Sequence, residues 1–162
     1  MATDVFLKVE SIDGESTDEQ HKKWCELSSF NWGMTQPASM ASATGGRTAE
    51  RVNVHDLSFS KVMDTATPHM MQACCTGKHF PKAQLEVCEA SETKHVYLKI
   101  EMEDVIVSSY QPTGINGGDK IQETGTLNFG KVKWEYTPLS HDGKSGSKVG
   151  PMGWNLEENK KI

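Results

Sequence analysis

The chain has 162 residues, of which 36% are hydrophobic and 24% charged, and its formal net charge is −5. This length and composition predict one folded domain over residues 1–162 and argue against wholesale disorder. The acidic balance argues against nucleic-acid binding, and no stretch approaches the roughly 18 apolar residues that suggest a membrane span. We therefore expect neither nucleic acid nor membrane insertion.

The first third of the chain is typical of short strands separated by polar loops. Apolar side chains alternate from Val5 to Val9, which predicts a strand. Residues 14–23 are polar and indicate a loop, and residues 24–33 are expected to be extended. Residues 35–51 are rich in Ser, Thr, Ala and Gly, which predicts a long loop of the kind that is often functional.

The clearest helix signal covers about residues 67–77. Thr67 is a capping residue type, Pro68 suits the first helical position, and Gly77 suits the C-terminal stop. One side of this helix gathers side chains suited to core packing: Met70, Met71, Ala73 and Cys74. We expect the helix to seal one end of a β-barrel or sandwich.

Strands are predicted in residues 52–62, 83–88, 96–110 and 124–136, because apolar and polar residues alternate there. The segment 96–110 has the cleanest alternation of the four. A glycine-containing loop is expected between the last two strands. The second half of the chain is therefore predicted to be β-rich.

The apolar positions change parity within several of these strands. In 96–110 they are even up to Met102 and odd from Val105, and in 124–136 they change on either side of Gly130. Because a strand alternates faces with period two, such a change predicts a bulge or a change of buried side. A closed barrel needs bulges at its corners. Burial by a neighbouring subunit predicts the same pattern, and both can hold together.

No sequence motif indicates catalysis or metal binding: CxxC, HExxH and phosphate-binding loops are absent, and the six histidines are scattered. The best enzyme alternative is a small cytoplasmic β-barrel enzyme or ligand-binding module with a Cys–His site near Cys74, Cys75, His69 and His79. A position late in a helix disfavours the thiolate, however. We therefore expect no catalytic residue, no metal and no cofactor.

The four cysteines are expected to be reduced thiols. Cys74 and Cys75 are adjacent, so a bond between them would be strained, and a domain of this size does not require disulfides. We expect the protein to be made in the cytoplasm, and we interpret its cysteines mostly as small apolar residues: Cys25, Cys74, Cys75 and Cys88.

An ordered series of segments along the whole chain resembles one known family. The segments are ATDVFLKV at 2–9, GES at 14–16, FNWGM at 30–34, VNVHDLSFSK at 52–61, GKHFP at 77–81, VSSY at 107–110, ET at 123–124, LNF at 127–129 and GWNL at 153–156. In order and spacing they resemble the Hcp family, the tube proteins of bacterial type VI secretion.

The resemblance implies a compact β-barrel of two sheets with one flanking helix. It also implies six subunits in a ring, and rings that stack into a tube and are exported with effectors in the lumen. The implied partners are the chain itself, the sheath, spike and baseplate proteins of the secretion machine, and effectors. Because the N-terminus lacks a Sec-type leader, we expect a bacterial cytoplasmic protein that type VI secretion carries to the exterior or into a target cell. Phage tail-tube proteins share this fold, and a phage tube remains an open alternative.

Two sets of residues are assigned through this resemblance. The segment expected to line the lumen and contact effectors supplies Ser28, Ser29, Asn31 and Trp32. The loop expected to mediate ring stacking supplies Ser42, Thr44, Gly45, Gly46 and Arg47. Asn31 stands where many relatives have serine, so the chemistry of the lining is expected to differ.

Overall fold

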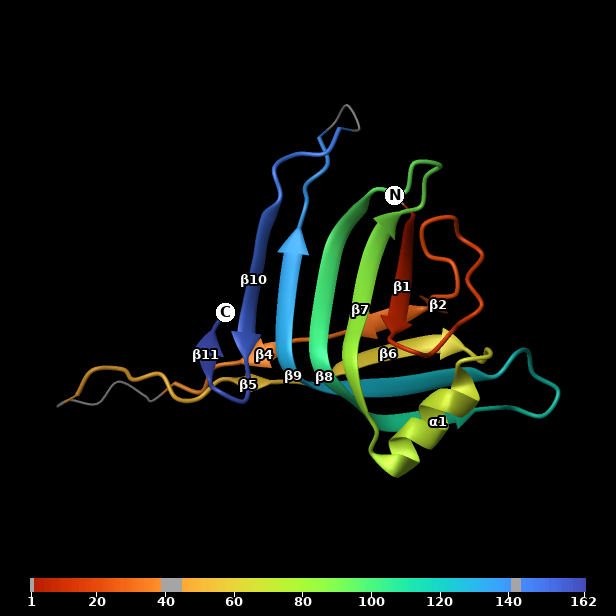
Figure 1. Cartoon of the computed structure of the whole chain (residues 1–162), viewed down its shortest axis with the longest axis horizontal. Coiled ribbons are helices and arrows are strands. Elements are labelled where there is room, and N and C mark those ends of the chain that lie inside the picture. Colours follow the sequence, from red (N-terminus) through yellow and green to blue (C-terminus); the bar gives the residue numbers. More distant parts are fainter. Residues whose placement is uncertain (1, 39–44, 141–143) are drawn as a thin grey trace.

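Antiparallel strands make up most of the protein in the computed structural model, which describes residues 2–38, 45–140 and 144–162 (Figure 1). In chain order the elements are β1 (Thr3–Val9), β2 (Cys25–Leu27), β3 (Ser29–Asn31), β4 (Met34–Thr35), β5 (Asn53–Val54), β6 (Leu57–Val62), α1 (Thr67–Thr76), β7 (His79–Glu89), β8 (Val96–Thr113), β9 (Gln122–Tyr136), β10 (Val149–Asn155) and β11 (Lys160–Lys161). The prediction of a mainly β protein with one short helix is confirmed. In the described part of the chain, no helix has the length and apolar character needed to cross a membrane.

One large sheet wraps around the core and closes on itself. Its strands are hydrogen-bonded in the order β11-β10-β9-β8-β7-β1-β2, and β6 pairs with both β9 and β3. β2 continues through Ser28 into β3, and the backbone N–H of Ser28 donates to the carbonyl of Ser60 on β6 at 2.7 Å. The path through β1, β2, β3, β6, β9, β8 and β7 therefore returns to β1 and forms a barrel. The second sheet is the small pair β4–β5.

The two longest strands bend at the same level, where the sequence predicts a parity change. Asp104 on β8 has a left-handed backbone, with φ of +54°, and lies opposite Gly130 on β9. A Cβ atom on Gly130 would lie 2.8 Å from Glu157 Oε1, so glycine leaves room for this approach. The buried residues of β8 change from Met102 to Val105 across the bend. β8 and β9 thus serve both halves of the barrel (Figure 1).

Residues 52–62, predicted as a single strand, differ from this pattern. The chain forms two strands there, and they pair with different partners. β5 pairs with β4, whereas β6 pairs with β3 and β9. One predicted strand is therefore two.

The barrel interior is filled by apolar side chains from every long strand. Leu7 on β1 pairs with Leu85 on β7, which pairs with Ile100 on β8, and these side chains are at most 3% exposed. Complete burial of such a side chain contributes about 1.5–3 kcal/mol relative to exposure. This packing holds together strands that lie far apart in the sequence.

Helix α1 covers one end of the barrel, as predicted, but with a narrower face. Thr67, Met70 and Ala73 are buried, whereas Cys74 is half-buried and Met71 is 42% exposed. The inclusion of Met71 in the packing face was therefore wrong, because residues 67, 70 and 73–74 share one side of a 3.6-residue helix and 71 does not.

The two ends of α1 are also specified locally. The first residue outside the helix is Ala66, not Thr67, and its N–H donates to Asp64 Oδ1 at 2.9 Å. At the other end Gly77 adopts φ of +66°, the left-handed conformation that commonly terminates a helix. The predicted glycine stop is confirmed, whereas Thr67 is not the capping residue: that position is Ala66, which makes no side-chain cap hydrogen bond.

Candidate functional site

One outer surface of the barrel is built from two rows of uncharged polar side chains, which we call the neutral face. The first row is Asn31, Ser58, Thr126 and Ser109, and the second is Ser29, Ser60, Thr124 and Gln111. Each row runs across β3, β6, β9 and β8 through directly paired residues. Every member is exposed or half-buried, and together the rows line a shallow depression.

The neutral face follows from strand alternation. On β6, Leu57 and Phe59 point into the core, so Ser58 and Ser60 point outward. Thr126 Oγ1 hydrogen-bonds to Ser109 Oγ at 2.6 Å, which joins neighbouring strands through their side chains. The surface is therefore held both by the backbone ladder and by hydroxyl groups.

The residues predicted to line the lumen divide into three locations. Ser29 and Asn31 lie on the neutral face. Ser28 lies in an adjoining depression with Glu26 and Asp64. Trp32 packs inward: its ring lies 5.7 Å from Trp134, and its indole N–H donates to the carbonyl of His55 at 3.0 Å. The structure thus brings two of the four residues together and adds six polar neighbours.

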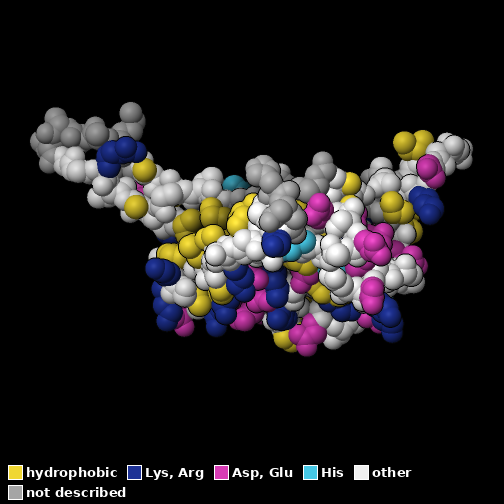
Figure 2. Space-filling view, turned by 90° about the horizontal axis from the view of Figure 1, so that it is seen from above, with side chains coloured by type: hydrophobic (Ala, Val, Ile, Leu, Met, Phe, Trp, Pro, Cys, Tyr) yellow, Lys and Arg dark blue, Asp and Glu magenta, His cyan; other side chains and the backbone are white. Residues whose placement is uncertain are grey.

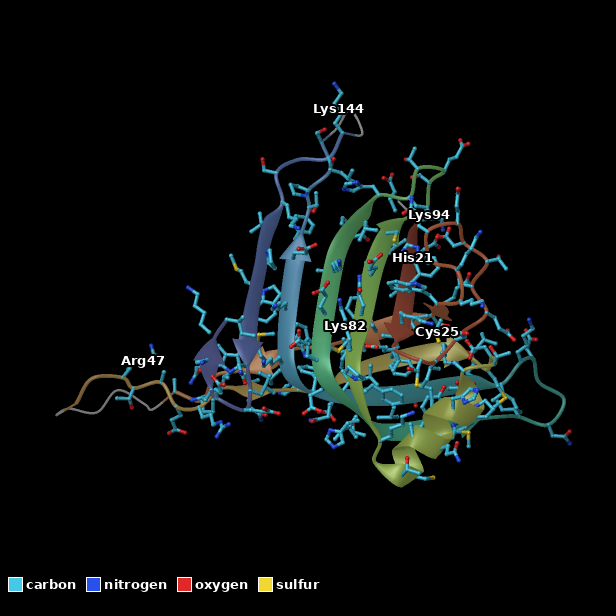
Figure 3. The ribbon with its side chains drawn as sticks, viewed as in Figure 1. His21, Cys25, Arg47, Lys82, Lys94 and Lys144 are labelled. Atoms are coloured by element: carbon cyan, nitrogen blue, oxygen red, sulfur yellow. The ribbon has the colours of Figure 1, made fainter. Side chains whose placement is uncertain are left out.

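A projecting arm contains the described part of the predicted stacking loop (Figure 1). Strands β4 and β5 form its base, and Ala38 and Ala49 bridge farther out. Figure 2 shows the arm reaching well beyond the barrel, and Figure 3 places Arg47 on it. Gly45, Gly46 and Arg47 are exposed, whereas Ser42 and Thr44 lie outside the described residues.

Beneath the neutral face lies a buried ionic cluster that the sequence analysis missed. Lys61 Nζ lies 2.9 Å from Glu123 Oε2 and 2.7 Å from Asp64 Oδ1, and the side chains of Lys61 and Glu123 are fully buried. Tyr110 donates its hydroxyl proton to Glu123 Oε2. The alternation of β6 and β9 indicated this burial. Lys61 and Glu123 stand at odd-numbered positions, as do the buried residues Phe59 and Leu127 of the same strands.

The electrostatics of this cluster favour a charged lysine. Burial by itself lowers the pKa of Lys61, but hydrogen bonds to Asp64 and Glu123 outweigh it and raise the pKa above the ordinary lysine value. Burial and then the hydrogen bond to Glu123 raise the pKa of Tyr110. Lys61 is therefore the cation that both carboxylates contact inside the barrel.

One histidine of the alternative Cys–His site is bonded to a carboxylate. His79 is held by Asp104, with Nδ1 and Oδ1 2.7 Å apart, and all four cysteines are free. Cys75 is exposed and Cys74 half-buried, whereas Cys25 and Cys88 are buried. Cys88 lies near a different histidine, with its Sγ 3.8 Å from Nε2 of His21, although the two residues are far apart in the sequence.

We expect alkylating reagents to modify Cys75 first, Cys74 more slowly, and Cys25 and Cys88 only after unfolding. Burial raises the pKa of both buried thiols to about 12, so they stay protonated near neutral pH, where the thiolate is the nucleophile. Mass spectrometry of iodoacetamide-treated protein, with and without urea, measures this order. Native-state modification of Cys25 as fast as that of Cys75 would contradict it.

The barrel, the neutral face and the projecting arm define a structural protein that acts through its surfaces. Residues 6–136 match the family described as "Type VI secretion system effector, Hcp". The chain belongs to the Hcp family of type VI secretion tube and effector proteins, which is structural and non-enzymatic. The predicted family is confirmed.

Full-length relatives agree with this assignment. Protein hcp1 of Pseudomonas aeruginosa is 41% identical over 162 residues, which covers 98% of each chain. A solved structure of a type six secretion system protein has a TM-score of 0.95 at 40% identity and covers 99% of this chain and 100% of its own. Hcp1 from Salmonella typhimurium has a TM-score of 0.79 at 35% identity, and both chains are covered completely.

Proposed function

We propose that this chain is a single-domain subunit of the inner tube of a type VI secretion system. Six copies form a ring, rings stack into a tube, and the tube leaves the cell with effectors in its lumen. Family membership supports the secretion context, and the neutral face is the observation that supports the lumen. The sheath, spike and baseplate proteins are the expected partners of the tube.

The neutral face suits a channel that must hold and release different proteins. The chain carries a net charge of −5, so six copies carry six times that charge, or −30. Charged side chains of both signs intermingle on another surface in Figure 2, yet both rows of the neutral face are uncharged. A lumen lined by hydroxyl and amide groups offers hydrogen bonds without ion pairs, so acidic and basic cargo meet similar walls.

The arm is proposed to contact the next ring. It extends from β4 and β5 away from the barrel, which is the geometry required to reach a stacked neighbour. Exposed Gly45, Gly46 and Arg47 provide backbone groups and a cation for that contact, and Ser42 and Thr44 are assigned to the same loop. The bulk of the barrel then remains free to pack sideways within its own ring.

The ring and the orientation of its lumen can be tested in one experiment. Light scattering after size exclusion is expected to give the mass of six chains of 17.9 kDa each, and electron micrographs are expected to show sixfold rings. A gold cluster attached through Ser60→Cys, in a Cys74→Ser, Cys75→Ser background, is expected inside the ring.

The matched control attaches the same cluster to the natural Cys75 on α1, where it is expected outside the lumen. A stable monomer without rings would overturn the tube function. Rings that carry the Ser60→Cys cluster on their outer wall would overturn only the assignment of the neutral face.

A further inference from the structure

A second polar cluster lies on the outer face of the barrel sheet, under the loop between β1 and β2. The loop folds over the outer face of β1 and β7 and is held by backbone bonds such as Gly14 N–H to Lys23 O at 2.8 Å. His21 in this loop is 1% exposed and stacks on Phe6, with ring centroids 4.2 Å apart. The loop therefore buries a titratable ring against the sheet.

Both ring nitrogens of His21 face acidic groups. Nδ1 lies 2.8 Å from Asp18 Oδ2, and Nε2 lies 2.6 Å from Glu86 Oε2. Cys88 Sγ lies 3.8 Å from the same Nε2. Glu86 and Cys88 are two residues apart on β7, so their side chains leave the same face of the strand. One nitrogen, one carboxylate oxygen and one sulfur thus lie within 4.8 Å of one another.

We propose that His21 Nε2, Glu86 Oε2 and Cys88 Sγ bind a thiophilic divalent cation of the zinc type. Histidine nitrogen, carboxylate oxygen and cysteine sulfur are the donors that zinc takes, at about 2.0–2.3 Å. Two donors of one tetrahedral zinc lie roughly 3.3–3.8 Å apart, so the Cys88–His21 spacing fits directly. The Glu86–His21 spacing must open by roughly 1 Å, as the ion replaces the proton between them.

Asp18 is the positioning residue of this site. A carboxylate on the distal nitrogen of a metal-binding histidine fixes the tautomer and the ring orientation, and Asp18 occupies that place on Nδ1. Lys94 Nζ lies 3.2 Å from the other oxygen of Asp18 and balances its charge. Asp18 therefore aims His21 Nε2 at Glu86 and Cys88 while remaining outside the donor set.

The charges balance when an ion is bound. A divalent cation with one thiolate, one carboxylate and a neutral imidazole has no net charge, which suits a buried position. Binding displaces the thiol proton of Cys88 and the proton on His21 Nε2 into solvent. The Glu86 side chain is 14% exposed and gives the ion a route inward, whereas Cys88 is buried. An ion here ties the loop to β7 and so stabilises this side of the barrel.

Cobalt(II) is the probe that tests the proposal, because thiolate ligation to it produces a charge-transfer absorption band. Titration of the metal-free, assembled protein with Co²⁺ is expected to give this band at one ion per chain, and Zn²⁺ is expected to abolish it. Cys88→Ser is expected to lose the band, whereas the matched Cys75→Ser variant keeps it, because Cys75 is an exposed thiol on α1. Zn²⁺ is expected to raise the thermal midpoint of the parent and not that of Cys88→Ser.

Asp18→Asn keeps all three donors and is expected to weaken Co²⁺ binding about 10–100-fold. It keeps the proposal testable if Cys88→Ser fails to fold, and circular dichroism monitors folding of each variant. Absence of the band in the folded parent would overturn the proposal. A band that survives in Cys88→Ser but disappears in Cys75→Ser would also overturn it, because the ion would then be held by the helix thiols.

Discussion

Replacing Lys61 by methionine is expected to lower the free energy of unfolding by about 3–5 kcal/mol, because it leaves Glu123 buried without its cation. Methionine keeps most of the aliphatic volume, so the loss reports the charge and not a cavity. Urea unfolding followed by circular dichroism measures the difference. Because the folded-state pKa of Lys61 is raised, its contribution is fully present below the ordinary lysine pKa and is lost only as pH rises through the raised value. The difference is therefore expected to stay constant from about pH 6 to pH 9.

Two controls separate buried charge from general damage. Adding Glu123→Gln to Lys61→Met removes the orphaned carboxylate and is expected to restore part of the lost stability. Lys82→Met removes a lysine from an exposed pair with Glu101, 3.8 Å away, and is expected to cost at most about 1 kcal/mol. If Lys61→Met proves no more harmful than Lys82→Met, the buried cluster does not stabilise the barrel.

Replacing Gly125 by alanine is expected to destabilise the protein by about 1–3 kcal/mol through overpacking. Gly125 on β9 is buried directly under the neutral face, and its neighbours on both sides are aromatic. An added Cβ atom would lie 2.6 Å from Phe59 Cζ and 3.0 Å from Tyr110 Cδ2. These rings already pack edge to face at 6.3 Å, so neither can withdraw easily. Urea unfolding again measures the change.

A double-mutant cycle with Phe59→Leu identifies the cause. The smaller side chain removes the closest atom, so the double variant is expected to be more stable than the sum of the single effects requires. Additive effects would mean that the glycine is needed for a reason other than space. The matched variant Gly33→Ala has no atom within 4 Å of the new Cβ and is expected to change stability by less than about 1 kcal/mol.

The sequence predicted features that depend on local periodicity. The bend at Asp104 and Gly130 follows from a parity change within each strand, and the glycine stop of α1 follows from one residue. The neutral face was found only through Ser29 and Asn31, because its rows join four strands whose pairing is not written in any one of them.

Other features depended on distance in the chain or on a charge that hid a position. The burial of Lys61 and Glu123 was not predicted, although the parity of their strands places both side chains inside. Their burial is stabilised because each supplies the other with a counter-ion. His21 and Cys88 meet only when the loop folds over β7, and no spacing rule connects them.

On the neutral face the backbone sets the shape of the surface, and the side chains set its chemistry. Its curvature is set by main-chain hydrogen bonds among β3, β6, β9 and β8, and its side chains contribute nothing to the apolar core beneath. Substitution of one small polar residue by another in either row therefore changes the chemistry of the surface while leaving the backbone pairing and the apolar core intact. The hydrogen-bonding groups of the surface can therefore change one residue at a time during evolution, while the barrel fold is kept.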